Sequence, residues 1–248
     1  MAAVPIQVVP VRGEPMAPAT APALTYRGGP LLTTVQVYVL FWGAPWQQAP
    51  LATLAAQINQ FFDYVVTSPL MDQLAEYSTS DRLIGHGSRL GSTVLVDPAP
   101  AASVTDAGVQ QLIQQALRGN PAIPQPGAGS LYYVFLPPGM SVSLSGSSSC
   151  VGFCGYHSDM DLRTGAKLFY AVMPYPDCSG CAGGLSVLDA LTSTTSHELC
   201  EAITDPVPGQ GWYDDHNGEI GDICAWQTKT LGAYTVQLEW SNLAGRCI

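Results

Sequence analysis

The sequence predicts an α+β fold, a single domain in which helices pack on a mixed β-sheet. Three observations lead to this fold class. Short apolar runs rich in β-branched and aromatic residues end at Gly or Pro, as buried strands do. Longer segments repeat apolar residues with the helical period of about 3.6 residues. Strand and helix candidates are interspersed along the chain, which is typical of an α+β domain with a mixed sheet.

The chain divides into an arm and a domain. Residues 1–26 hold five of the twenty prolines and are predicted to form an extended, Ala/Pro-rich arm. No secretory leader is recognisable there, because a basic start followed by a long apolar stretch is lacking. Residues 27–248 are predicted to form the domain. With 47% hydrophobic residues, the chain of 248 residues can bury one large core.

The first half of the domain is predicted to hold both kinds of element. The run Val-Gln-Val-Tyr-Val-Leu-Phe-Trp is short and closed by a Gly-Ala-Pro turn, which favours a buried strand. Later, Thr105 or Ser103 can cap a helix with an apolar stripe. The expected elements are strand 35–42, helix 51–67, a short helix 69–77, strands 83–85 and 92–96, helix 105–118 and strand 131–136.

The second half is predicted to centre on one long helix. Ser186 precedes Asp189 with the spacing of a capping box, and Pro206 requires the helix to end before it. The other expected elements are a Ser-rich loop 141–149, strand 167–173, a Gly-rich loop 209–221, and strands 223–229 and 233–240 as a C-terminal β-hairpin.

The charge balance excludes two classes of partner. The formal net charge is −10 and the isoelectric point is about 4.5, so the chain repels phosphate backbones and anionic lipid headgroups. Charged residues make up only 11% of the chain, which suits an extracellular medium better than the cytosol. No apolar run approaches the roughly 18 residues of a membrane span. We expect no nucleic-acid partner and no membrane span.

The cysteines indicate a secreted protein. All seven lie beyond residue 149, at positions 150, 154, 178, 181, 200, 224 and 247. This clustering favours disulfides, with Cys224 and Cys247 closing a C-terminal loop and Cys200 left as the odd thiol. One alternative is a structural four-cysteine zinc site made by the two close pairs. Another is a redox dithiol at the Cys-Ser-Gly-Cys pair, which Ala-Gly-Gly separates from the next helix and which is therefore disfavoured.

The residues that carry chemistry lie on the long helix. The segment His197-Glu198-Leu-Cys-Glu201 places His197 and Glu201 one turn apart, about 40° around the helix axis. This is the geometry of His-Glu-x-x-His metallopeptidase helices, with the second His replaced by Glu. In that motif the first and last residues bind the metal, and Glu198 is placed to activate metal-bound water. The opposing interpretation is a solvated helix face that carries a surface histidine.

The acidic segment after the helix is expected to complete the site. Between Lys167 and Lys229 there are nine carboxylates and no Lys or Arg, and unpaired carboxylates at this density imply a cation. Glu219 follows Glu201 by eighteen residues and Asp222 follows it by twenty-one, so either can be the third ligand. We expect Zn²⁺. One histidine with two carboxylates is a hard ligand set, so Ca²⁺ or Mn²⁺ is the alternative.

A set of motifs extends well beyond this helix. They are Leu24-Thr-Tyr-Arg-Gly-Gly-Pro-Leu-Leu32, the strand run that ends at Trp42-Gly43, Phe153-Cys-Gly-Tyr-His157, Ser196-His-Glu-Leu-Cys-Glu201, Asp205-Pro206 and Glu219-Ile-Gly-Asp-x-Cys224. Together they resemble the phosphate-induced, EXORDIUM-like family from about residue 24 to the C-terminus. The resemblance implies export, disulfides and a zincin-like core around the helix. Plant members are cell-wall-associated proteins linked to growth, and the family has no agreed biochemical activity.

His157 gains a role from this resemblance, because Cys-Gly-x-His is among the recurrent motifs of the family. We expect His157 to be a catalytic-site residue, either as a further metal ligand or as a donor to the oxyanion that forms when water attacks a carbonyl. A structural role is the ordinary alternative for a lone histidine that follows a cysteine.

Two functions are predicted. The first is a secreted metal-dependent peptidase or peptidase-like hydrolase, in which the ligands named above hold the metal and Glu198 is the general base. The second is a non-catalytic extracellular module with a structural metal site. Such a module would bind cell-wall polysaccharide or a partner through exposed Trp212, Tyr213 and Trp226.

Overall fold

The computed structural model describes residues 8–13, 21–163 and 165–248. Residues 1–7 and 14–20 of the predicted arm lie outside the described residues. The part of the arm that is described contributes two short strands, β1 (Val9–Pro10) and β2 (Thr25–Tyr26).

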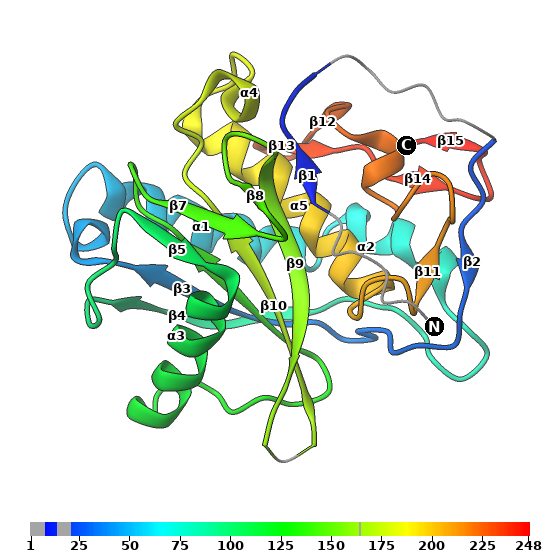
Figure 1. Cartoon of the computed structure of the whole chain (residues 1–248). Coiled ribbons are helices and arrows are strands. Elements are labelled where there is room, and N and C mark those ends of the chain that lie inside the picture. Colours follow the sequence, from blue (N-terminus) through cyan, green and yellow to red (C-terminus); the bar gives the residue numbers. More distant parts are fainter. Residues whose placement is uncertain (1–7, 14–20, 164) are drawn as a thin grey trace.

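A six-stranded mixed sheet forms the centre of the molecule (Figure 1). Its strands lie in the order β1, β9 (Phe153–Asp161), β10 (Lys167–Met173), β6 (Ser130–Phe135), β3 (Gln36–Trp42) and β4 (Ser88–Leu95). The last four are parallel, β9 is antiparallel to β10, and β1 is antiparallel to β9. The predicted mixed sheet with packed helices is confirmed. Its parallel centre makes the fold a mixed α/β arrangement rather than the predicted α+β.

The strands bury both faces of this sheet. Alternate residues such as Val39 and Ala171 face one side, which α1 (Leu51–Val65) and α5 (Val187–Thr204) cover. The intervening residues, such as Leu40, face α3 and a small sheet on the other side. Those elements are α3 (Asp106–Gly119), β5 (Ser103–Thr105), β7 (Ser141–Leu144) and β8 (Ser147–Ser148). Two hydrophobic cores therefore flank the sheet.

Helix α5 is enclosed on all sides. Its side chains are buried from Ala190 to Thr204, and it contacts β9 and β10, α1, and β13 (Tyr234–Gln237). At its start the Ser186 hydroxyl accepts a hydrogen bond from the Asp189 amide, and the helix ends before Pro206, both as predicted. The C-terminal strand β13 covers the side of α5 that carries His197, so no face of the helix is open to solvent between Ala190 and Thr204.

Several predicted elements are confirmed with shifted ends. Thr105 caps α3 as expected, and the C-terminal hairpin exists as β12 (Thr228–Leu231) and β13. The predicted strand 223–229 begins instead as a 3₁₀ helix, and the predicted strand 83–85 forms no ladder, because pairing starts at Ser88. The remaining elements are η1 (Ala44–Gln47), α2 (Pro69–Leu74), η2 (Ala75–Tyr77), α4 (Ser179–Ala182), β11 (Trp212–Tyr213), η3 (Asp222–Cys224), β14 (Trp240–Ser241) and β15 (Arg246–Cys247).

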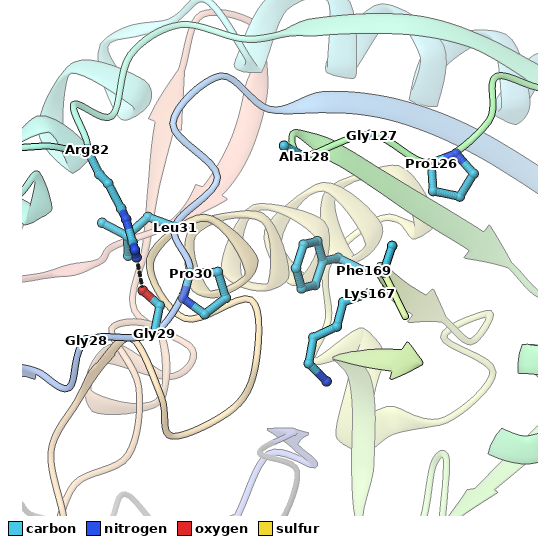
Figure 2. Close-up of a pocket in the computed structure, with 11 residues that line it drawn as sticks. Gly28, Gly29, Pro30, Leu31, Arg82, Pro126, Gly127, Ala128, Lys167 and Phe169 are labelled. Carbon is cyan, nitrogen blue, oxygen red and sulfur yellow. Dashed lines mark hydrogen bonds between the residues drawn. The ribbon is translucent and has the colours of Figure 1, made fainter. Parts of the chain in front are cut away.

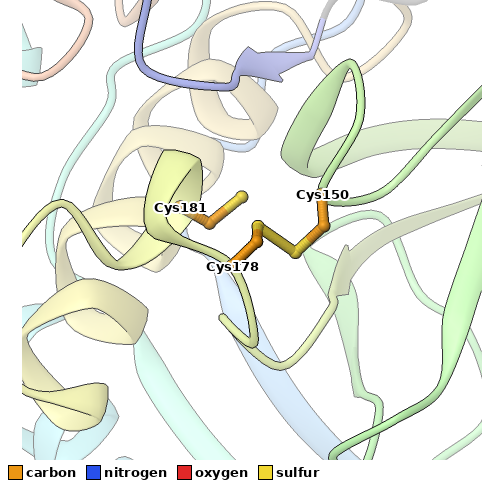
Figure 3. Close-up of side chains that lie close together, drawn as sticks. All are labelled: Cys150, Cys178 and Cys181. Atoms are coloured by element: carbon orange, nitrogen blue, oxygen red, sulfur yellow. A yellow bond between two sulfur atoms is a disulfide. The ribbon is translucent and has the colours of Figure 1, made fainter.

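Three disulfides staple the C-terminal half. Cys224 bonds to Cys247 as predicted, and the buried Cys200 is the free thiol. The two close pairs are cross-linked to each other. Cys150 bonds to Cys178 (Figure 3), and Cys154 bonds to Cys181. Both the four-cysteine zinc site and the redox dithiol are therefore wrong, because these sulfurs are consumed in separate bonds. The three disulfides fit a protein exported to an oxidising compartment. Among the described residues, no helix has the length and apolarity to span a membrane.

Candidate metal centre

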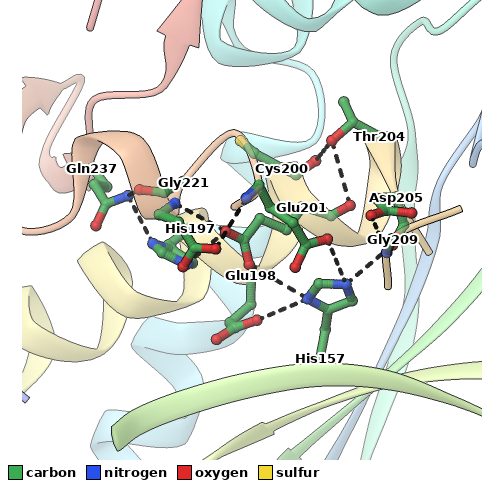
Figure 4. Close-up of polar contacts among 12 residues, drawn as sticks. His157, His197, Glu198, Cys200, Glu201, Thr204, Asp205, Gly209, Gly221 and Gln237 are labelled. Atoms are coloured by element: carbon green, nitrogen blue, oxygen red, sulfur yellow. Dashed lines mark hydrogen bonds and ion pairs between the residues drawn. The ribbon is translucent and has the colours of Figure 1, made fainter. Parts of the chain in front are cut away.

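Helix α5 carries its three motif residues into the interior. The side chains of His197, Glu198 and Glu201 are all 0% exposed, so the interpretation of this segment as a solvated helix face is wrong. Residues from β9 and from the segment after α5 join them. We call this group the α5 cluster; it consists of His157, His197, Glu198, Glu201, Glu219 and Asp222. Figure 4 labels the first four of these.

Glu201 lies at the centre of the cluster, between the two histidines. Its Oε1 is 2.9 Å from His197 Nε2, one helical turn away, and also accepts a hydrogen bond from the Asp222 amide at 3.1 Å. Its Oε2 is 3.5 Å from His157 Nδ1. Two groups of possible metal ligands therefore share this one carboxylate. One is His157, Glu198 and Glu201, and the other is His197, Glu201 and Asp222.

Strand β9 holds His157 against the helix. His157 Nδ1 is 3.1 Å from Glu198 Oε2, and its Nε2 faces the main-chain oxygen of Asp205 at 3.2 Å. The close approach of β9 to α5 requires a glycine two residues earlier. A Cβ added to Gly155 would lie 2.7 Å from Thr194 Cγ2 and 3.3 Å from Glu198 Oε1. The backbone of β9 therefore lies directly beside the free oxygen of Glu198.

The segment after α5 supplies three carboxylates with different surroundings. Asp205 is buried, and its oxygens accept hydrogen bonds from the amides of residues 209, 210 and 211, so its charge is compensated locally. Glu219 Oε1 lies 3.5 Å from His157 Nε2, and Asp222 Oδ1 lies 4.0 Å from His197 Nε2. Of the two predicted third ligands, Asp222 joins the His197 side, whereas Glu219 joins the His157 side.

Gln237, on β13, sets the orientation of the His197 ring. Its Oε1 accepts a hydrogen bond from the Trp226 amide, and its Nε2 contacts both the Gly221 oxygen at 2.9 Å and His197 Nδ1 at 2.7 Å. In this orientation Nδ1 accepts, which places the ring proton on Nε2, toward Glu201. Were His197 to hold a metal, it would do so through an unprotonated Nε2, and its Nδ1 would then donate to the Gln237 amide oxygen, which would have to turn toward it.

Burial and mutual proximity shift the pKa values within the cluster. Burial alone would lower the pKa of His157, but the surrounding carboxylates, led by Glu219, raise it well above its ordinary value. Burial raises the pKa of Glu219 far above that of an ordinary glutamate, and that of Asp222 to about 8. Burial also favours a raised pKa for Glu201, yet the two histidines outweigh it and bring that pKa to about 2. Burial alone would also lower the pKa of His197, but Glu201 and the other carboxylates raise it well above its ordinary value. Both histidines therefore favour the charged form, whereas Glu219 and Asp222 favour the neutral form.

The cluster has the donor set that a divalent cation requires. Among the described residues, several of its buried oxygens take part in no hydrogen bond, although His157 lies 3.5 Å from two of them; they are Glu198 Oε1, Glu201 Oε2 and both carboxylate oxygens of Glu219. A buried carboxylate oxygen without a donor is costly, and a metal ion removes that cost. Imidazole nitrogen with carboxylate oxygen suits Zn²⁺, and the high proportion of oxygen also suits Mn²⁺ or Ca²⁺. The residues present therefore fit a metal.

Sequence reasoning missed two residues near the cluster. Gln237 and Glu239 alternate with Val236 and Leu238, a pattern typical of a strand with one solvated face, yet their side chains are only 1% and 0% exposed. Glu239 has two oxygens without a hydrogen bond among the described residues. Only the tertiary position of β13 against α5 reveals that these polar residues face inward.

Two surface cavities lie away from the cluster. One, of about 660 Å³, opens at the N-terminal ends of β3, β6 and β10, between Arg82 and Lys167 (Figure 2). The other, of about 710 Å³, lies beside the start of α3 and the β7–β8 turn. Neither is lined by a residue of the α5 cluster. A substrate therefore does not reach Glu198 through either cavity.

Comparison of the chain with known proteins found no match. No family model matches the chain, and no curated protein or solved structure matches it. The resemblance to the EXORDIUM-like family stays a prediction, and the function is argued from the residues.

Proposed function

We propose that the chain is a secreted metal-dependent hydrolase that acts on peptides, with a zincin-like site around α5. The observation that carries this proposal is the state of Glu198. Its Oε2 is held by His157 Nδ1, while its Oε1 is buried and takes part in no hydrogen bond with the described residues. A carboxylate fixed at one oxygen and free at the other is suited to serve as a general base.

Charge balance supports a divalent cation at this site. Burial raises the pKa values of Glu219 and Asp222, so a further buried anion is costly here, and a divalent cation would offset that cost when these carboxyl groups ionise. The ligand atoms of His197, Glu201 and Asp222 lie within 4.8 Å of one another and are the ones that would hold it. Zinc is the first candidate and Ca²⁺ or Mn²⁺ the alternative. When bound, such an ion polarises water and the substrate carbonyl.

Glu198 then performs the proton transfer. Its Oε1 accepts a proton from the attacking water and passes it to the leaving amine nitrogen. Burial raises the pKa of Glu198, which brings it closer to neutral pH, where a base of this kind is most efficient. His157 is a positioning residue in this scheme. Both of its ring nitrogens face protein partners, so the predicted role as oxyanion donor is not favoured.

The resemblance to the EXORDIUM-like family and the three disulfides support a secreted setting for this activity. The second candidate is a non-catalytic extracellular module, and the burial of the cluster favours it, since His157 and Glu198 are 1% and 0% exposed. The aromatic residues predicted to bind glycan are not exposed, however. Tyr213 is buried, and Trp212 and Trp226 are half-buried. A glycan-binding surface would have to lie elsewhere.

The deciding experiment measures metal and hydrolysis together. We expect plasma mass spectrometry to find one zinc per chain in the wild type and none in the His197→Ala, Glu201→Ala double variant. Glu198→Gln should retain the zinc but lose at least about 100-fold in hydrolysis of a fluorogenic peptide library. The matched control is Glu76→Gln, whose carboxylate accepts hydrogen bonds from Ser241 and Asn242 and should keep both properties.

Three results would contradict the proposal. Unchanged hydrolysis in Glu198→Gln with zinc bound would remove the general base. Absence of metal from the wild type would leave only a metal-free binding module. Saturable binding of a cell-wall polysaccharide that survives both chelation and Glu198→Gln, with no hydrolysis in the wild type, would establish the second candidate instead.

A further inference from the structure

Residues 8–13 form an extended segment, here called the strap, along the outer edge of β9, the edge that faces away from β10. On its inner edge β9 pairs with β10, and in the described part of the chain β1 is the only strand on its outer edge. Val9 pairs with Gly155 and Pro10 with Phe153, in antiparallel register. The amides of Val11 and Arg12 then donate to the main-chain oxygens of Gly152 and Gly180. The strap is therefore an extended peptide held mainly through its backbone.

The strap pairs with a part of β9 that lies close to Glu198. Gly155, which pairs with Val9, is the residue of β9 whose backbone is directly beside Glu198 Oε1. Figure 1 shows β1, in dark blue, beside β9, and β1 also contacts α5. Strand addition to an exposed sheet edge is a general mode of peptide recognition, in which backbone hydrogen bonds supply affinity and side-chain pockets supply specificity.

Two side chains of the strap make specific contacts with the rest of the protein. Val9 is 0% exposed and packs in a small cluster with the Cys154 and Cys181 disulfide. The guanidinium carbon of Arg12 lies 4.2 Å from the centre of the Trp226 ring, a cation–π arrangement. Its Nε is buried and takes part in no hydrogen bond with the described residues. A net charge of −10 adds a general attraction for such a cation.

We propose that the outer edge of β9 is the binding edge for an extended peptide, and that residues 8–13 occupy it as an intramolecular ligand. The preferred peptide carries a β-branched apolar residue at the position of Val9 and an arginine three residues later, over Trp226. That this edge delivers a substrate to Glu198 rests on the proposed function; the binding itself does not. The strap thus blocks the approach of other peptides.

The test releases the strap after the protein has folded. Residues 14–20 are replaced by the recognition sequence of a site-specific protease, the full chain is purified, and it is then cleaved. The strap contains no cysteine, so no disulfide retains it after cleavage. The probe is a fluorescein-labelled peptide, Val-Val-Pro-Val-Arg-Gly, whose binding is followed by fluorescence polarisation. Circular dichroism before and after cleavage checks that the fold persists.

We expect the cleaved protein, after gel filtration, to bind the probe saturably and at least about tenfold more tightly than the uncleaved protein. A probe with Glu in place of Arg should bind at least about tenfold more weakly. Trp226→Leu should weaken the arginine probe but not a probe with Ala at that position. In the uncleaved chain, Arg12→Glu should also admit the probe, which tests the proposal without cutting the backbone.

The outcomes separate this inference from the proposed function. Probe binding without any peptide hydrolysis supports the binding edge and contradicts the hydrolase. Hydrolysis that the strap peptide neither inhibits nor competes with contradicts the binding edge and leaves the hydrolase standing. A cleaved protein that loses residues 1–13 and still fails to bind the probe, or that binds the Arg and Glu probes equally, overturns the inference.

Discussion

Helices α3 and α5 cover opposite faces of the same sheet; α3 brings one carboxylate toward it, and α5 brings those of Glu198 and Glu201. Two consecutive residues of β9 meet them. Tyr156 donates its hydroxyl proton to Asp106 on α3 at 2.8 Å, while His157 faces Glu198 on α5. Asp106 also accepts hydrogen bonds from the Tyr170 hydroxyl and the Gln110 amide. The carboxylate on α3 is thus fully paired with neutral donors.

In the α5 cluster, several carboxylate oxygens lack such donors. Glu198 Oε1, Glu201 Oε2 and both oxygens of Glu219 take part in no hydrogen bond with the described residues, although they are more deeply buried than Asp106. A carboxylate that only stabilises the fold is given neutral donors, as Asp106 is. Carboxylates that converge without donors are stable together only if protons or a cation join them. The metal site proposed for the α5 side would account for this difference, and the following predictions test that proposal.

Metal removal should have the largest effect. At a free zinc concentration about a thousand times Kd, a bound ion stabilises the fold by about 4 kcal/mol. For a domain of this size that corresponds to a Tm shift of about 10 °C. Differential scanning calorimetry of zinc-loaded protein with and without chelator measures the shift. The Glu201→Gln variant is the control, and its Tm should not respond to chelator. If the wild type contains stoichiometric zinc and its Tm does not change with chelator, the proposal that a metal stabilises the α5 side is wrong.

The next effect concerns the stability of the metal-free protein, which should fall rather than rise as the pH increases from 5 to 8. Glu219, Asp222 and His157 all have raised pKa values in the folded state. Between pH 5 and pH 8 the folded chain therefore binds more protons than the unfolded chain. Stability follows the sign of this difference, so it falls as pH rises. Glu201, with a pKa lowered to about 2, makes stability rise with pH instead, but only at pH values below the pKa of an unfolded glutamate.

We therefore expect the metal-free Tm to be higher at pH 5 than at pH 8. Zinc competes with the same protons, so its affinity rises with pH and the Tm gain on zinc binding is greatest near pH 8. Calorimetry across this range at constant ionic strength provides the measurement. If the metal-free Tm instead rises from pH 5 to pH 8, the buried carboxylates of the α5 cluster are stable as anions without protons or a metal. The proposed difference from Asp106 would then be wrong.

The sequence predicted the helix residues of this site better than their surroundings. Local spacing places His197 and Glu201 one turn apart, and the capping of Ser186 and the stop at Pro206 are equally local, so all were predicted correctly. Burial of the helix on every side depends on where β13 packs, which no local pattern encodes. For the same reason Asp222 and Glu219 could not be distinguished, because the turn between them directs one toward each histidine.

Gly221→Ala should have a smaller effect that is confined to the α5 side. An added Cβ would lie 2.8 Å from the His197 ring and 2.9 Å from Glu201 Oε1, so the backbone that carries Asp222 must shift. We expect zinc affinity to fall by about 10- to 100-fold, as is typical when groups that orient metal ligands are disturbed. Competition with a fluorescent zinc indicator measures it. Gly119→Ala, at the end of α3 with open space around it, is the matched control and should leave zinc affinity unchanged.

Asp106→Asn should have the smallest effect, because α3 pairs its carboxylate with neutral donors. The asparagine oxygen can still accept from Tyr156 and Tyr170, which both contact Asp106 Oδ1 at 2.8 Å. Only the contact from Gln110 to Oδ2 places two amide groups together, at a cost of about 1 kcal/mol. The Tm loss should be the same with zinc and with chelator, since no ion is involved on this face. A loss that depends on zinc would place Asp106 in the same electrostatic system as the α5 cluster, and the two faces of the sheet would then have to be treated as one site.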